Sequence, residues 1–79
     1  MNEVYKKIQV IALERTWVSF LHENHPYTLL RWSISSMKDE MEEWLLQNEI
    51  TFEIKKFSNV DEAMYFIMQN MYSTDILLE

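Results

Sequence analysis

The chain of 79 residues contains no glycine, although average usage of about 7% would place about five or six in a chain of this length. Several binding and catalytic turns need glycine, because only a residue without a Cβ lets the backbone approach a ligand closely or turn sharply. The absence of glycine therefore excludes the phosphate-binding P-loop, the dinucleotide-binding fingerprint and the glycine-containing nucleophile elbow.

The length predicts a single domain over residues 1–79, because so short a chain cannot build two separate hydrophobic cores. Hydrophobic residues make up 48% of the chain and charged residues 25%, which is typical of a folded protein and not of a disordered one. Residues 73–79 follow the last periodic segment, and we expect them to be a flexible C-terminal tail.

Cysteine is absent as well, which excludes disulfides and thiolate metal sites. The N-terminus has no basic and apolar pattern of a secretory signal, and no apolar run approaches the roughly 20 residues of a membrane span. These features predict a cytoplasmic protein that makes no contact with a membrane.

The net charge of −6 comes from 13 acidic and 7 basic residues. Such a charge repels phosphate backbones and attracts basic surfaces. Two small clusters of lysines beside an aromatic residue, at residues 5–7 and 55–57, are weak signs of nucleic-acid binding in so acidic a chain. We therefore expect no direct binding of nucleic acid, and a partner protein with a basic surface.

The first half of the chain has patterns typical of strands. These are "VYKKIQVIAL" at residues 4–13, "TWVSFLH" at 16–22 and "YTLLRWSI" at 27–34. Between the last two, "ENHP" predicts a hairpin loop of about four residues, in which Asn24 tolerates a left-handed backbone. A helix over residues 3–23 is the competing interpretation, but its apolar residues scatter over two sides of a helical wheel.

The second half begins with a helix signal. Ser36 as N-cap, with Asp39 at the third helical position, predicts a helix over residues 37–48. "TFEIKKF", at residues 51–57, predicts the fourth strand. Asn59 as a cap, followed by Glu62 in a box-like arrangement, predicts a second helix over residues 60–72.

The predicted order of elements is β-β-β-α-β-α. It indicates an α+β domain, in which a small and mostly antiparallel four-stranded sheet carries two helices packed on one face. If the third and fourth strands are parallel neighbours, their connection should be a right-handed crossover.

The segment "YTLLRWSI" has apolar side chains on both sides of its strand, so a second face needs a cover. We expect Leu30 and Trp32 to face the helices. Three residues then face away and belong to a partner-binding patch: Tyr27, Leu29 and Arg31. Either a partner or a second copy covers this patch, or the N-terminal segment or the C-terminal tail does, or the predicted faces are shifted by one residue.

Acidic residues gather on the outward side of the predicted first helix. The expected partner-binding residues there are Asp39, Glu40, Glu42, Glu43 and Leu46. This surface would dock a basic partner or imitate a phosphate backbone, and the alternative is an ordinary solvated helix face. On the second helix, Tyr65 and Phe66 lie outside the core stripe and are further partner-binding candidates, unless they belong to a methionine-rich core.

The sequence His22-Glu23-Asn24-His25 brings two imidazoles and a carboxylate together, which raises a metal site or a general base as hypotheses. The spacing does not match the helical H-E-x-x-H motif, and no nucleophile accompanies it. We therefore expect a polar hairpin loop, and no metal, cofactor or catalytic residues.

Taken together, these features predict a small acidic protein-binding module that is not an enzyme. A more specific hypothesis is an inhibitor from a phage or mobile element that acts on a host protein handling nucleic acid. The alternative is an obligate homo-oligomeric structural or scaffold subunit, for which a homodimer is the simplest form.

Overall fold

A computed structural model describes the backbone of residues 3–35, 40–71 and 74–77, and the side chains of all of these except 33–35, 40–42 and 74. The helices and strands follow in the order α1 (Glu3–Arg15), β1 (Trp17–His22), β2 (His25–Ser35), β3 (Glu40–Asn48), β4 (Ile54–Phe57), α2 (Val60–Asn70) and β5 (Thr74–Ile76). Neither helix is long and apolar enough to cross a membrane within this described part of the chain.

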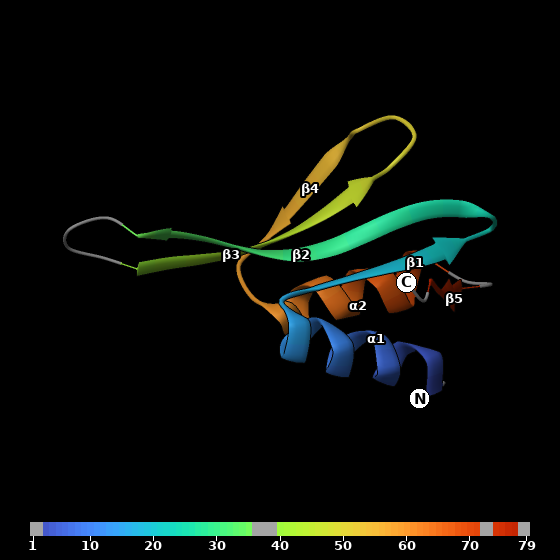
Figure 1. Ribbon diagram of the computed structural model, residues 1–79, viewed down its shortest axis with the longest axis horizontal. Helices are drawn as coiled ribbons and strands as arrows, with labels where there is room; N and C mark the ends of the chain where they lie inside the picture. The colour runs from blue at the N-terminus through green and yellow to red at the C-terminus, as the bar shows by residue number, and fades with distance from the viewer. Residues whose placement is uncertain (1–2, 36–39, 72–73, 78–79) are drawn as a thin grey trace.

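The strands form one antiparallel sheet in the order β4-β3-β2-β1-β5. Both helices lie on the same side of it, with α1 against β1 and α2 against β3 and β4 (Figure 1). The predicted α+β class with an antiparallel sheet and two helices is confirmed, although the sheet has five strands and not four. Since the strand pairs described are all antiparallel, the crossover expected for a parallel pair does not arise.

The hairpin of β1 and β2 is confirmed, but its turn is shorter than predicted. His22 pairs with His25, so only Glu23 and Asn24 form the turn. Their φ angles of 49° and 68° are both left-handed, as a two-residue type I′ turn requires. Asn24 therefore has the backbone predicted for it, while His25 and Pro26 belong to β2.

Residues 3–15 form α1, so the predicted first strand at residues 4–13 is wrong. Ile8 and Ala12 are fully buried and lie one helical turn apart. A helical wheel over residues 3–23 does not show this stripe, because it also includes Trp17 and Phe20, which fall on another side of the wheel. Both of these residues lie in β1, beyond the end of the helix, and the buried residues that remain fit one side of it.

The predicted helix over residues 37–48 is also wrong in its described part, because Glu40–Asn48 form β3. The segment is rich in helix-forming residues, yet it pairs with β2 along its whole length. Trp44 and Leu46 are buried while Leu45 between them is half-buried, which is the period of a strand. Long-range pairing has outweighed local propensity here. The predicted N-cap at Ser36 lies outside the described residues.

The second predicted helix is confirmed as α2. The Asn59 side chain accepts a hydrogen bond of 2.9 Å from the Glu62 backbone N–H, as an N-cap should. In return the Glu62 carboxylate accepts one of 3.3 Å from the Ser58 N–H. At the other end, the Tyr5 hydroxyl donates a hydrogen bond of 2.5 Å to the Met71 carbonyl, which joins α1 to the end of α2.

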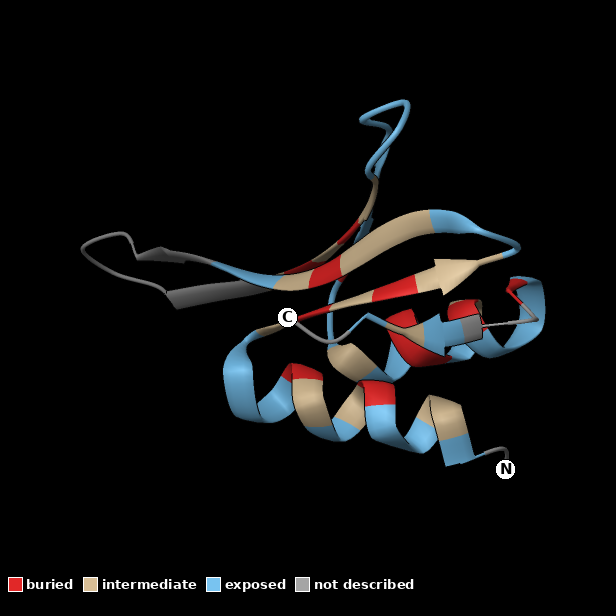
Figure 2. Cartoon of the chain, turned by 45° about the vertical axis from the view of Figure 1, so that its right-hand side comes forward, coloured by how far each residue is buried: buried red, intermediate tan, exposed pale blue. Residues whose placement is uncertain are grey.

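The core lies between the helices and one face of the sheet, which we call the inner face (Figure 2). Directly paired residues of antiparallel strands share a face. Val18, Leu29 and Leu46 form one such row across β1, β2 and β3, and all three are buried. The predicted faces of β2 are therefore shifted by one residue: Leu29 faces the helices, while Leu30 and Trp32 face away.

This reversal of faces can be tested with two neighbouring leucines. Leu29 is 0% exposed, so we expect Leu29→Ala to lower the free energy of unfolding by about 2–5 kcal/mol, because it leaves a cavity in the core. Leu30→Ala, on the opposite face, should cost about 1 kcal/mol or less. Urea denaturation measures both values, and equal losses would contradict the observed register.

Candidate protein-binding surface

The face of the sheet that points away from the helices, the outer face, carries a row of large apolar side chains. Trp17 pairs with Leu30, Leu30 with Leu45, and Leu45 with Lys56, so the row crosses four strands. The first three are only half-buried, although each is paired with a neighbour in the row. No helix of the described chain covers them, since α1 and α2 both lie on the inner face (Figure 1).

Two more exposed apolar side chains extend this row. Trp32 follows Leu30 by two positions in β2 and is 52% exposed, and Ile54 precedes Lys56 by two positions in β4 and is also 52% exposed. Monomeric proteins rarely leave a contiguous patch of this kind in contact with water. Tryptophan is enriched among the residues that dominate the energy of protein–protein contacts.

The charged groups of the outer face lie around its apolar row. Glu43 pairs with Trp32, and Lys56 ends the row on β4. At the opposite end of the row the guanidinium of Arg15, the last residue of α1, lies 4.6 Å from the centre of the Trp17 ring, which is a cation–π contact. An apolar centre with a charged margin is the usual organisation of a protein interface.

Beyond this patch, β2 and β3 continue as a two-stranded arm. The pairing of β1 with β2 ends at Leu30 and that of β4 with β3 ends at Trp44, so residues 32–35 and 40–43 pair with each other only, among the residues described. The arm projects away from the helices (Figure 1). An isolated two-stranded ribbon of this kind is only marginally stable in water.

A second surface lies on the inner face, where the sheet extends past the end of α2. It is a hollow of about 350 Å³ lined by both apolar and polar residues: Tyr27, Leu46, Asn48, Glu53, Ile54, Lys55, Phe66 and Met71. The Lys55 ammonium lies 4.9 Å from the centre of the Phe66 ring, and the Tyr27 hydroxyl accepts a hydrogen bond of 3.2 Å from the Asn48 amide. Three predicted partner-binding residues therefore meet here: Tyr27, Leu46 and Phe66.

The loop between β3 and β4 is built around Asn48. Its side-chain oxygen accepts hydrogen bonds from the Ile50 N–H, at 2.9 Å, and from the Thr51 N–H, at 3.1 Å. Its backbone accepts one of 2.7 Å from the Phe52 N–H and donates one of 2.9 Å to the Glu53 carbonyl. Phe52 has a φ of 64°, a left-handed backbone that costs a bulky residue about 1 kcal/mol or more. The loop is thus strained but held by many bonds.

Most of the acidic surface predicted from the sequence is not on a helix. Glu40, Glu42 and Glu43 lie on β3, and Asp39 is outside the described residues. Of these, the side chain of Glu43 is described and is half-buried on the outer face. Leu46 is only 4% exposed and faces the helices, so it offers little surface to a partner. The predicted residues of this segment are divided between two faces, because neighbouring residues of a strand point to opposite sides of the sheet.

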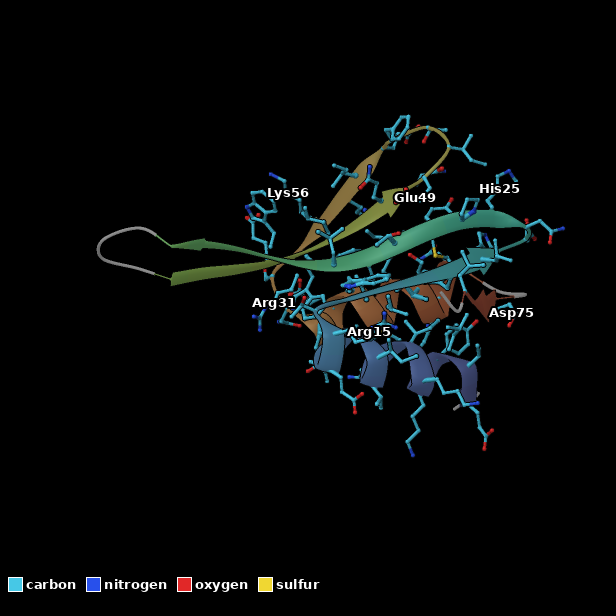
Figure 3. All side chains as sticks on the ribbon, in the orientation of Figure 1. Arg15, His25, Arg31, Glu49, Lys56 and Asp75 are labelled. Atoms are coloured by element: carbon cyan, nitrogen blue, oxygen red, sulfur yellow. The ribbon has the colours of Figure 1, made fainter. Side chains whose placement is uncertain are left out.

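The remaining predicted residues do not form a single exposed surface. Leu29 belongs to the core, and Arg31 is exposed on the helix side of the sheet (Figure 3). Tyr65 is 68% exposed on α2. Phe66 is half-buried against Phe57, with ring centres 5.5 Å apart. From the sequence, Trp17 was one of two alternatives for the outer face, while Leu30, Leu45 and Ile54 were missed, although the strand alternation would have identified them once the register was known.

His22 and His25 lie opposite each other at the turn of the first hairpin. His25 Nδ1 is 3.1 Å from the carbonyl oxygen of Glu23, and the ring of His22 lies 6.0 Å from that of Tyr27. Within the described part of the chain, no group of three or more histidine and carboxylate side chains is placed to hold a metal ion.

The role of Asn48 gives a prediction about the β3–β4 loop. Asn48→Ala removes two hydrogen bonds to the loop backbone, so we expect it to lower the free energy of unfolding by about 1–2 kcal/mol and to speed amide exchange at Ile50 and Thr51. Gln47→Ala, at the preceding position on the other face, should leave both amides as protected as before. Unchanged exchange in the Asn48 variant would contradict this role.

Comparison with known protein families identifies the family of the chain. The family model described as "Protein of unknown function (DUF2552)" matches residues 1–77, and the chain belongs to this family. Searches of curated proteins and of solved structures gave no match.

Proposed function

We propose that this member of the DUF2552 family is a protein-binding module that is not an enzyme, and that it binds its partner through the outer face of the sheet. One observation carries the proposal. The row from Trp17 through Leu30 to Leu45, extended by Trp32 and Ile54, forms an apolar surface that no described element of the chain covers.

The chemistry of this surface favours a protein as the partner. Two tryptophans provide large apolar areas that lose little conformational freedom on binding, and binding energy in protein interfaces concentrates in such residues. The charge of the chain further favours one kind of partner. Because the whole chain carries a net charge of −6, a partner with a basic surface would be attracted before contact.

The idea that an acidic helix imitates a phosphate backbone loses its argument, because the described carboxylates of that group lie on β3. We therefore propose the broader function, in which the apolar outer face makes the contact and acidic residues assist it.

A homo-oligomeric subunit is the second candidate, and the arm of β2 and β3 favours it. Both edges of this arm have unpaired backbone groups among the residues described, and a second copy could add strands to either edge. Sedimentation equilibrium over a hundredfold range of concentration tests this. A stable dimer whose unfolding midpoint rises with concentration supports it, while a monomer at every concentration contradicts it.

The binding proposal itself predicts the effect of a single exposed tryptophan. Trp32→Ser should reduce the recovery of a bound partner at least about tenfold, because a buried tryptophan anchor commonly contributes more than the roughly 1.4 kcal/mol of one such factor. Since Trp32 is 52% exposed in the free chain, the free energy of unfolding, measured with urea, should change little in this variant.

The measurement is quantitative mass spectrometry after affinity capture from the native host, with the tagged full chain. Tyr65→Ser is the matched control. Tyr65 was a binding candidate from the sequence, but it is 68% exposed on α2 and lies outside the surface proposed here. Partners lost with the Trp32 variant and kept with the Tyr65 variant fit the proposal. If the two variants recover the same proteins in the same amounts, the outer face is not the binding surface.

A further inference from the structure

The β3–β4 loop carries two exposed apolar side chains at its tip, away from the core. Ile50 is 56% exposed and Phe52 is 68% exposed. Both lie between two exposed acidic residues, Glu49 and Glu53. Figure 3 shows Glu49 in this loop, which extends from the sheet on the side opposite the helices.

Phe52 holds a conformation that its own side chain disfavours. Its φ of 64° lies in the left-handed region, where asparagine and glycine are common and bulky residues are rare. The loop keeps it there through the bonds to Asn48: the Phe52 N–H donates to the Asn48 carbonyl, and the Asn48 side chain accepts from the N–H groups of Ile50 and Thr51. A residue that is both strained and exposed contributes nothing evident to the stability of the fold, and such residues gather at functional sites.

We propose that residues 49–53 form a rigid anchor, which inserts Phe52 into an apolar pocket of the partner protein. The pocket should be lined by lysine or arginine at its rim, since Glu49 and Glu53 would meet that rim when Phe52 enters. This inference rests on the proposed function in one respect, because the partner is taken to be a protein. The anchor would be a second contact beside the outer face, and it predicts an apolar pocket with a basic rim on the partner.

The rigidity of the loop is what makes it suitable as an anchor. A flexible loop would lose conformational freedom on binding, whereas this one is held by its hydrogen bonds before any partner arrives. The flanking carboxylates also select the type of surface. They would be repelled by anionic lipid headgroups, while they would form charge-assisted hydrogen bonds with a basic rim.

The test uses the full chain in its native host, with the photo-reactive residue p-benzoylphenylalanine in place of Phe52. Illumination should yield one protein adduct, and peptide mapping should place the cross-link at an apolar site with lysine or arginine beside it. The same photo-reactive residue in place of Tyr65 is the matched control, because that aromatic side chain is equally exposed. It should not give this adduct.

Charge reversal provides the second arm. Glu49→Lys with Glu53→Lys should reduce the yield of the adduct at least about tenfold, and added salt should reduce it in the unchanged chain. Glu3→Lys with Glu14→Lys reverses two exposed acids on α1 and should leave the yield unchanged. An adduct that is insensitive to the loop charges, or one that joins two copies of this chain, overturns the proposal.

Two further measurements distinguish the anchor from a purely structural role of Phe52 and from insertion into a membrane. Phe52→Asn relieves the backbone, so it should raise the unfolding temperature by about 4–8 °C and yet fail to compete for the cross-link. Binding of the purified chain to vesicles of phosphatidylcholine and phosphatidylserine would instead identify a membrane and overturn the proposal. If the photo-reactive residue at position 32 is cross-linked to a partner and the one at position 52 is not, the result supports binding through the outer face and contradicts the anchor.

Discussion

The structure depends on the fact that two short helices can cover only one face of a five-stranded sheet. The buried side chains form one cluster between the inner face and the helices, and among the residues described all of them are apolar. Ile8 and Ala12 supply the contact from α1, and Ala63 and Ile67 the contact from α2. The apolar row on the outer face is what remains when the helices have been used in this way.

The absence of glycine places a second demand on the fold. Among the residues that the structure describes, four have positive φ angles, namely Thr16, Glu23, Asn24 and Phe52. Asn24 adopts this backbone readily, but Thr16 and Phe52 do not. Hydrogen bonds hold Thr16: its hydroxyl donates to the Arg15 carbonyl, and its own carbonyl accepts from the Arg31 N–H at 2.8 Å. Side-chain and long-range bonds thus replace the freedom that glycine would have given.

The sequence predicted those parts of the fold whose signals are local. The hairpin around Asn24 and the cap of α2 by Asn59 were predicted, because each depends on residues a few positions apart. The two errors have different causes. In α1 the boundary was missed, so that residues of β1 obscured a helical stripe, and in β3 a helix-forming sequence was held extended by β2.

The candidate surface was predicted only in outline. The sequence showed that "YTLLRWSI" has a second apolar face that needs a cover. Leu29 and Leu30 are equally apolar, however, so the alternation along one strand could not show which of them faces the core. That choice is made by the helices, through contacts between residues far apart in the chain. The loop anchor was missed altogether, because the left-handed backbone of Phe52 depends on Asn48 and has no signature of its own in the sequence.

The pairing of β5 with β1 has a consequence for synthesis of the chain. Phe20 in β1 pairs with Ile76 in β5, and the Leu77 N–H donates to the Ser19 carbonyl at 3.0 Å. During translation α1 and the strands β1 to β4 emerge first, and the edge of β1 has to wait until β5 has been made. Until then the nascent protein exposes an open strand edge, at which two growing chains can associate. Slow emergence of β5 would lengthen the period during which this edge of β1 is open.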